Sequence, residues 1–220
     1  RLGNFARGRV QAGERVEPFE TAVKLDPNFI DARFNLLEYY LMAPGIMGGS
    51  VEKARQQATE IKKRDAMTGH WAFAALAESE KDMVAAREEF AAAIRENPTS
   101  PQPHYRYGLF LMLSDKNNNG AAVEFDAALR VNANFMPARF QIGHLAALSG
   151  ANLARGEVAL QKYLTYRPGD DEPPLHRAHY WLGTIYEKQS KKADARGQFQ
   201  AALRLRPADK DAKQGLKRVS

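Results

Sequence analysis

Residues 43–54, APGIMGGSVEKA, place three glycines and a proline between two segments with helical patterning. Glycine-rich backbone ahead of a helix can bind phosphate, because free amides and the positive end of the helix dipole face the anion. A Walker-type loop needs glycine, four residues and then Gly-Lys-Ser/Thr, so that the lysine reaches the phosphates. Here Gly48 and Gly49 are followed by Ser50 and Val51, and the segment follows a helix pattern instead of a strand. We therefore do not expect a nucleotide loop of that type.

Two interpretations of this stretch stay open. In the first it is a wide turn in which Ser50 caps the next helix. In the second it is a binding loop with Ile46 and Met47 as an exposed apolar tip. Free amides at the helix start would then hold an anion or a partner's carboxylate. The residues of that site would be Gly45, Gly48, Gly49 and Ser50.

Five histidines raise the question of a metal site. His70, His104 and His179 occupy equivalent positions in three repeated helical segments. Successive segments pack about 10 Å apart, and His179 lies two segments beyond His104. That spacing is too wide for one ion, whose bonds to histidine are about 2 Å long. His176 and His179 lie three apart on one predicted helix, but no third ligand is evident nearby. We expect packed, hydrogen-bonded histidines and no metal.

Catalytic motifs are not found in the sequence. There is no Ser-His-Asp order, no HExxH and no dinucleotide glycine pattern. The chain has no cysteine, which excludes disulfides and thiolate nucleophiles. The carboxylate pairs Glu88-Glu89 and Asp170-Asp171 fit a solvated helix surface and a linker. The sequence therefore predicts a protein that is not an enzyme and binds no cofactor.

Composition sets wider limits. With 220 residues, 44% of them hydrophobic, the chain can bury a core, and nothing approaches eighteen consecutive apolar residues, so we expect no transmembrane helix. The net charge of +6 comes from residues 175–220, which carry eleven Lys/Arg against four Asp/Glu. One basic end is expected, and not a nucleic-acid-binding stripe along the protein.

A repeated pattern organises the chain. Residues 179–207, HYWLGTIYEKQSKKADARGQFQAALRLRP, contain small, aromatic and proline residues at fixed spacings, namely Leu182, Gly183, Tyr186, Ala195, Phe199, Ala202 and Pro207. This pattern resembles the tetratricopeptide repeat, a helix–turn–helix unit of 34 residues. The same frame recurs backwards along the chain, with one inserted residue in some turns and five in the turn that contains the glycine-rich stretch. At the start, Leu2-Gly3 opens partway through a first helix.

The resemblance predicts an all-α, right-handed superhelical solenoid of about six helix–turn–helix units, the first incomplete. The repeats are assigned to residues 1–29, 30–66, 67–100, 101–135, 136–174 and 175–208, with a capping helix at 209–220, in one domain spanning 1–220. The physics agrees. Apolar residues such as Phe34, Leu37 and Leu41 follow helical spacing, alanine and glycine at crossing positions let helices approach, and the prolines of LDPN, ENPTSP and YRPGDDEPP end helices. One pair cannot bury its apolar face alone, so neighbours must stack.

A narrower resemblance concerns location. APGIMGGSVEKA, together with TGHWAFA and IGHLAALSGANLARGE, is similar to a group of exported bacterial tetratricopeptide proteins without an established catalytic activity. The resemblance implies a periplasmic or otherwise exported protein, with the cytoplasm as the alternative. The chain begins at Arg1 instead of Met, so a preceding export signal, lipid anchor or further domain stays open.

In the tetratricopeptide family the first helices of the repeats line a concave groove that holds extended peptides or partner helices, and repeat positions 2, 5, 6, 9, 12 and 13 face it. Position 5 is aromatic in every complete repeat here. Aromatic residues dominate interface hot spots, although in the family they also serve packing. The predicted groove residues are Phe34, Glu38, Trp71, Tyr105, Arg106, Leu109, Phe140, Gln141, His144, Tyr180 and Trp181.

The ligand is expected to be an apolar or aromatic segment with one acidic group. Relatives that grip a C-terminal carboxylate carry lysine at position 5 and asparagine at position 9, and this chain has neither. Arg106 is the only cation among positions 5, 6 and 9.

Three functions compete. The leading hypothesis is a non-catalytic protein-interaction scaffold that binds a protein or peptide partner in its groove. A nucleic-acid or anionic-surface binder would act through the basic end, and a nucleic-acid partner is not the expectation. A small-molecule or anion site would use residues 44–50. Partner identity and oligomeric state stay open. The basic end comprises Lys191, Lys192, Arg196, Arg204, Arg206, Lys213, Lys217 and Arg218.

Overall fold

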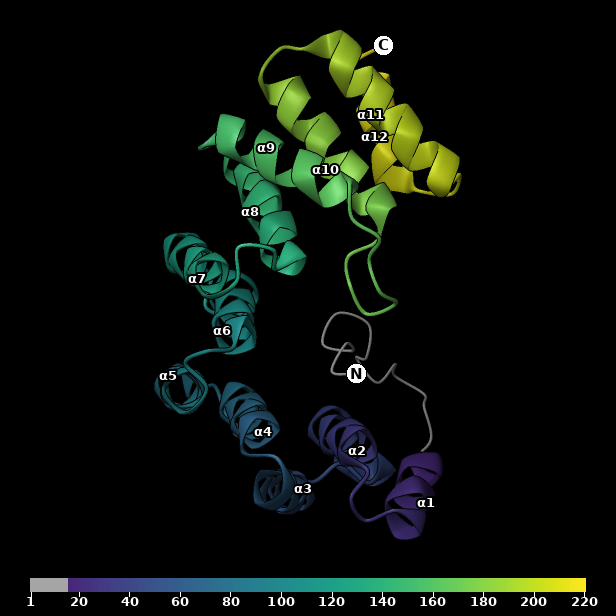
Figure 1. Ribbon diagram of the computed structural model, residues 1–220. Coiled ribbons are helices and arrows are strands. Elements are labelled where there is room, and N and C mark those ends of the chain that lie inside the picture. The colour runs from purple at the N-terminus through teal and green to yellow at the C-terminus, as the bar shows by residue number, and fades with distance from the viewer. Residues whose placement is uncertain (1–15) are drawn as a thin grey trace. The chain divides into compact units, whose positions relative to one another are not determined.

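The computed structural model describes residues 16–220. In this part of the chain the regular secondary structure is helical, with no strand. The predicted all-α class is confirmed for this part of the chain (Figure 1). None of its helices has the length and apolar character needed to cross a membrane. The predicted helix containing Leu2 and Gly3 lies outside the described residues. The helices are α1 (Glu17–Leu25), α2 (Ile30–Met42), the 3-10 helix η2 (Gly45–Met47), α3 (Val51–Arg64), α4 (Ala66–Ser79), α5 (Met83–Glu96), α6 (Pro101–Leu113), α7 (Asn118–Val131), α8 (Met136–Ser149), α9 (Leu153–Leu164), α10 (Leu175–Lys188), α11 (Lys192–Leu205) and α12 (Lys210–Arg218).

The chain divides into two compact units, Arg1–Lys116 (unit 1) and Asn117–Ser220 (unit 2). The division falls between α6 and α7, which the sequence assigns to one repeat, 101–135. Each unit is treated separately below. The assignment of all 220 residues to one domain stays a prediction.

Short polar side chains and prolines set the helix ends. Ser50 caps α3 by accepting a hydrogen bond from the amide of Lys53 at 3.2 Å, as the turn interpretation predicts. Asp65 and Asp82 cap α4 and α5 in the same way. At the other end, α1 stops at Leu25 before LDPN continues into its proline, and α5 stops at Glu96 before ENPTSP. The proline stops are confirmed.

A left-handed residue recurs in the turns that join paired helices. Lys81, Asn152 and Ser190 have φ of 62°, 53° and 62° in the α4–α5, α8–α9 and α10–α11 turns. Between α2 and α3 this conformation is taken by Gly48, with φ of 92°. Glycine adopts it without the steric cost that other residues bear. The glycine-rich stretch is thus a longer version of a turn used elsewhere in the chain.

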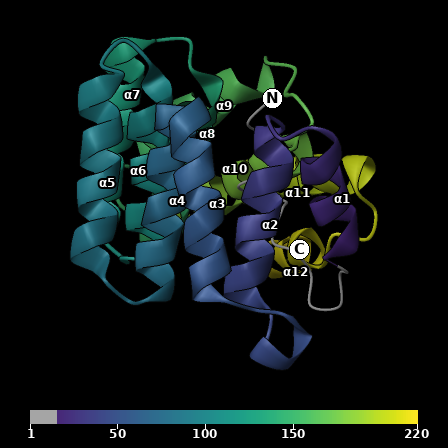
Figure 2. The ribbon, with the colours of Figure 1, turned by 90° about the horizontal axis from the view of Figure 1, so that it is seen from below.

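Unit 1 is held together by an apolar core between α2, α3 and α4. Leu37, Ala54, Ala58, Ile61 and Ala72 are completely buried in it. The three alanines bring backbones close, since a methyl group is all that separates them. Figure 2 shows α2, α3 and α4 side by side, and α2 contacts both of the others.

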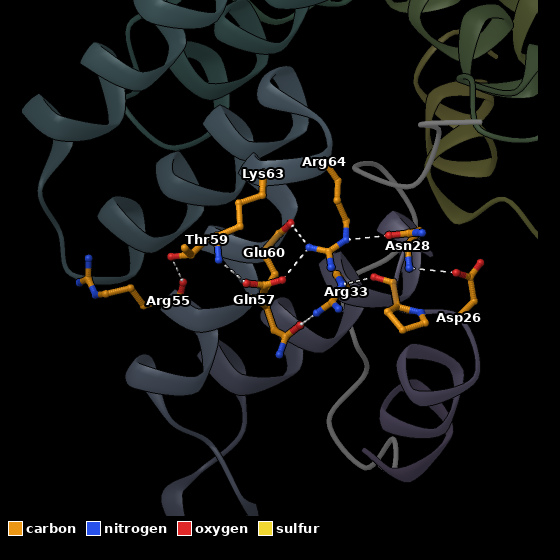
Figure 3. Close-up of polar contacts among 10 residues, drawn as sticks. Asp26, Asn28, Arg33, Arg55, Gln57, Thr59, Glu60, Lys63 and Arg64 are labelled. Atoms are coloured by element: carbon orange, nitrogen blue, oxygen red, sulfur yellow. Dashed lines mark hydrogen bonds and ion pairs between the residues drawn. The ribbon is translucent and has the colours of Figure 1, made fainter.

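A polar network fastens the α1–α2 turn to this core (Figure 3). The guanidinium of Arg33 donates to the carbonyl of Pro27 at 2.8 Å and to Gln57 Oε1 at 2.9 Å. Arg64 donates to Asn28 Oδ1 at 3.0 Å and pairs with Glu60. Hydrogen bonds from Lys63 and Arg64 lower the pKa of Glu60 to about 2. The turn is thereby fixed to α2 and α3.

Unit 2 depends on close helix contacts at glycine. A Cβ added at Gly143 of α8 would lie 2.2 Å from Leu160 Cγ of α9, and one at Gly156 would lie 2.4 Å from Ala146 Cβ. Phe199 of α11 is completely buried against Gly183 of α10. The predicted C-terminal helix is present as α12 and packs on α10 and α11.

Gly143→Ala tests this close packing. We expect it to destabilise unit 2 by about 1–3 kcal/mol, because the added methyl overlaps the fully buried Leu160. The control is Gly197→Ala in the exposed middle of α11, where an added Cβ meets nothing within 4 Å. That change should stabilise by about 0.4–1 kcal/mol through lower unfolded-state entropy. Urea unfolding followed by circular dichroism measures both, and equal effects would contradict the packing account.

Candidate functional site

Unit 1 carries a pocket on the face formed by α2, α4 and α6. Its volume is about 440 Å³, and most of its walls are apolar. Repeat positions 9, 12 and 13 supply most of the lining, so the helical spacing that builds the core also builds the pocket. The lining residues are Glu38, Leu41, Met42, Ala75, Glu78, Ser79, Phe90, Arg106, Leu109, Phe110, Leu113 and Ser114.

Arg106 and Trp71 form the buried floor beside this pocket. The guanidinium carbon of Arg106 lies 4.3 Å from the centroid of the Trp71 ring, a cation–π contact worth about 2 kcal/mol or more when desolvated. Burial lowers the pKa of Arg106 to about 10, and the charges of Tyr105 and Glu38 oppose that shift. Arg106 therefore keeps its charge at neutral pH while exposing only 6% of its surface.

This arrangement changes the role predicted for the aromatic residues at repeat position 5. Trp71 is only 1% exposed, because Arg106 covers its ring, so it has a packing role and does not offer its face to a partner. Phe34 is partly buried against the core of unit 1. Tyr105 is partly buried on α6. Of the residues predicted for the groove in this unit, Glu38, Arg106 and Leu109 line the pocket.

In unit 2 the structure brings five predicted residues into one aromatic cluster on α8 and α10. His144 stacks on Trp181 with ring centroids 4.3 Å apart, and Trp181 meets Tyr180 edge-on at 4.7 Å. Gln141 Oε1 lies 3.2 Å from His144 Nδ1. Phe140 and Gln141 are buried, whereas His144, Tyr180 and Trp181 keep part of their surface exposed.

Arg177 completes this cluster. Its guanidinium carbon lies 4.8 Å from the centroid of the Tyr180 ring and 5.1 Å from that of Trp181, while its Nη1 pairs with Asp211 at 2.8 Å. Burial, followed by the charge of Arg177, lowers the pKa of His144 to about 4. The imidazole is therefore neutral at neutral pH, and the cluster presents partly exposed aromatic faces beside the ion-paired guanidinium of Arg177.

Four amides of the glycine-rich stretch already donate to carbonyls of the chain. The amides of Met47 and Gly49 donate to the carbonyl of Pro44, and that of Gly48 donates to Gly45. The amide of Ser50 donates to Tyr40. The hypothesis of an anion site at Gly45, Gly48, Gly49 and Ser50 is weakened, because the amides of the last three residues are already engaged.

The loop is also held rigid. The hydroxyl of Tyr39 donates to the carbonyl of Met47 at 2.5 Å. A Cβ at Gly49 would lie 1.7 Å from the carbonyl oxygen of Ala43, so only glycine fits there. Ile46, at the tip, is 98% exposed, as the second interpretation predicts.

The histidines are packed and hydrogen-bonded. His70 is 3% exposed, and its Nδ1 lies 2.6 Å from Glu89 Oε2. His179 Nδ1 lies 2.7 Å from Gln198 Oε1. Within residues 16–220 no group of three or more His, Asp or Glu side chains is arranged to hold a metal ion.

Half of the basic side chains at the C-terminal end already have partners within unit 2. Lys191 pairs with Glu157 at 3.1 Å, and Arg218 donates to both oxygens of Glu187 at 2.7 and 2.9 Å. Two further guanidinium groups, those of Arg196 and Arg206, contact the carbonyl of Val219 and the ring of His176. This engagement weakens the hypothesis of a nucleic-acid or anionic surface.

Several site residues are absent from the predicted set although the repeat positions point to them. That set was drawn from positions 5, 6 and 9, whereas positions 2, 12 and 13 also face the groove. Applying all six positions would have found Leu41, Met42, Glu78, Leu113 and Arg177.

Replacing Trp71 tests whether this predicted groove residue is part of the core. We expect Trp71→Ala to destabilise unit 1 by about 3–5 kcal/mol, because it opens a core cavity and strips the aromatic face from Arg106. Leu113→Ala, on a side chain that is 56% exposed, is the control and should change stability by less than about 0.5 kcal/mol. Denaturant unfolding measures both. If Trp71→Ala were as stable as the control, the Trp71 ring would lie on the groove surface and not in the core.

Titration of His144 tests the environment of the aromatic cluster. Its ring signals in a pH series by NMR should show a midpoint near 4. The unfolded chain titrates near 6.5 and binds protons more readily, so unit 2 should lose stability as the pH falls from about 6.5 to 4. Arg177→Gln should raise the midpoint by removing one cause of the shift. A wild-type midpoint near 6.5 would mean that the ring is hydrated.

The sequence and the fold resemble those of known proteins. Residues 176–209 match the family model of the tetratricopeptide repeat. No protein of curated function matches the sequence. The fold is similar to that of YrrB, a tetratricopeptide protein with an unusual peptide-binding site, at 18% identity over 92% of this chain and 99% of YrrB, with a TM-score of 0.59.

Two further solved structures show the same fold. Yeast Tom70 is 18% identical, with a TM-score of 0.74, over 93% of this chain and 42% of Tom70. PilF from Pseudomonas aeruginosa is 14% identical, with a TM-score of 0.60, over 92% of this chain and 87% of PilF. One stretch of 34 residues, 176–209, thus matches the tetratricopeptide family model, and the all-α fold is similar to that of the tetratricopeptide protein YrrB along most of the chain.

Proposed function

We propose that the chain is a non-catalytic interaction scaffold, and that unit 1 binds an extended or helical segment of a partner protein in the pocket of α2, α4 and α6. The observation that carries the proposal is the pocket itself, about 440 Å³ with mainly apolar walls. The pocket can take one or two large apolar side chains, whose burial stabilises a complex by about 1.5–3 kcal/mol each before ordering costs.

The walls of this pocket suit an apolar guest. Leu113 is 56% exposed and Met42 is 50% exposed, although both belong to helices whose other faces are well buried. Leucine and methionine adapt to varied guests, since their side chains can repack. The same fold carries a peptide-binding site in YrrB, which supports peptide binding as a function this fold can perform.

The cluster of His144, Tyr180 and Trp181 in unit 2 is a second contact surface under this proposal. Partly exposed aromatic rings give a large contact area at low entropy cost. The export of this protein to the bacterial periplasm is part of the proposal and rests on the sequence resemblance alone.

Peptide selection tests the pocket. A random library of displayed 12-residue peptides is selected on the immobilised protein, and the enriched peptides are synthesised with a fluorescent label. We expect them to share apolar residues. Their affinity for Leu113→Glu, measured by fluorescence anisotropy, should be at least about fivefold weaker, because a carboxylate would then face the apolar guest.

The matched control is Val84→Glu. Val84 lies on α5, is 63% exposed and does not line the pocket, so the same charge change there should leave the affinity unchanged. Thermal unfolding checks that both variants are folded. Failure to enrich any peptide, or equal affinity for wild type and both variants, would overturn the proposal.

A further inference from the structure

Unit 2 has a pocket of its own, lined by side chains of α7, α8 and α9. Its volume is about 500 Å³, which lies within the range of small-molecule sites. It shares no lining residue with the unit 1 pocket or with the aromatic cluster of α8 and α10, so the proposed function does not account for it. Most of its walls are apolar, and they comprise Leu129, Ile142, Ala154, Val158 and Ala159.

Helical spacing brings these walls together. On α8, Arg139 and Ile142 are three residues apart, and on α9, Val158 and Ala159 follow Arg155 by three and four residues. Residues at these spacings share one face of a helix. Ile142 and Ala159 are 7% and 5% exposed, whereas Val158 is 62% exposed. The pocket therefore runs from the core of unit 2 to its surface.

Two guanidinium groups are the charged part of this pocket, and the chain holds both in place. Arg155 of α9 pairs with Asp126 of α7. Arg139 donates from Nη2 to the carbonyl of Ala133 at 2.8 Å. Within residues 16–220 no carboxylate pairs with Arg139, and its covered Nε has no hydrogen-bond acceptor. An arginine has five N–H donors, so Arg139 has donors left for a ligand.

These groups define the chemistry of a ligand. A guanidinium binds the two oxygens of a carboxylate through parallel N–H···O bonds. Two guanidiniums and the carboxylate of Asp126 leave one positive charge, which suits a ligand with a single negative charge. The apolar walls suit a hydrocarbon chain, because its burial removes apolar surface from water. No side chain that lines the pocket can accept a hydrogen bond.

We propose that the unit 2 pocket binds a small aliphatic carboxylic acid. Its carboxylate would lie against Arg139 and Arg155, and its chain would lie along Leu129, Ile142 and Val158. The C-terminal residue of a protein has the same chemistry, but its peptide N–H groups would find no side-chain acceptor on these walls, which costs affinity. The free acid is therefore the ligand. This site does not depend on the peptide binding proposed for unit 1.

An NMR titration of the full chain with octanoate tests the site. The methyl signals of Ile142 and Val158 should shift together as octanoate is added, with a Kd below about 1 mM. Octanol has the same chain without the charge, and acetate has the same charge without the chain. Each should bind at least about tenfold more weakly, because it lacks one of the two contacts.

Variants assign the binding to these side chains. Arg139→Gln should weaken octanoate binding at least about tenfold, because it removes the guanidinium. Arg130→Gln is the matched control, since Arg130 is exposed on α7 and does not line the pocket. The same loss of charge there should change the Kd less than about twofold. Val158→Glu retains Arg139 but brings a second carboxylate to the pocket, and should also weaken binding at least about tenfold.

Thermal unfolding checks that each variant is folded. If Arg139→Gln does not fold, Val158→Glu at its exposed position still decides. Octanol that binds as tightly as octanoate would overturn the recognition of a carboxylate. Equal binding by wild type, Arg139→Gln and Val158→Glu would overturn the site. Tighter binding of acetyl-leucyl-leucine than of octanoate would replace the small acid by a protein C-terminus. Pocket methyl signals that do not shift up to about 10 mM octanoate would refute the proposal.

Discussion

The structure depends on how closely its helices approach. A two-helix unit has too little buried area to hold itself together, so each pair is stabilised by packing against its neighbours. Alanine or glycine at the contact points makes that approach possible, and any larger side chain would push the helices apart. The positions that are completely buried and small in this way include Ala54, Ala72, Ala86, Ala93, Ala121, Ala128, Ala195 and Ala202.

Once the small residues hold the helices together, the large side chains must go to the remaining faces. Some fill the space between neighbouring pairs, as Phe199 does in unit 2. Others are left on the inner face, where they line the unit 1 pocket or form the aromatic cluster of α8 and α10. The candidate binding surfaces of both units are therefore a consequence of the repeat.

The sequence predicts the helices well because their signals are local. Periodic apolar residues define each helix, prolines end α1 and α5, and Ser50 starts α3. The glycine-rich turn is also predictable, since it fails as a phosphate loop and has a place in the repeat. Its internal hydrogen bonds are not predictable, because they depend on backbone angles such as that of Gly48.

The spacing of residues in the sequence does not predict how deeply each inner-face side chain is buried. Trp71 and Tyr180 share repeat position 5, yet Trp71 is 1% exposed and Tyr180 is only partly buried. The difference lies in what covers each ring. Arg106 comes from another helix, α6, and closes over Trp71, whereas Arg177 lies on the same helix as Tyr180. Position in a repeat gives the direction of a side chain, and its neighbours decide how much of it is exposed.

The local charge of a surface, like the burial of a side chain, depends on neighbouring residues. The positive charge of the whole chain suggests an acidic partner, but charges are screened beyond about 8 Å at physiological salt, so mainly the local charges act on a ligand. In unit 2 the basic groups are drawn into pairs such as Arg218 with Glu187. In unit 1 the guanidinium of Arg106 is buried on the ring of Trp71, and it lines the pocket together with Glu38 and Glu78. The local charge of the pocket is therefore set by a few side chains and their partners, and it cannot be read from the net charge of the whole chain.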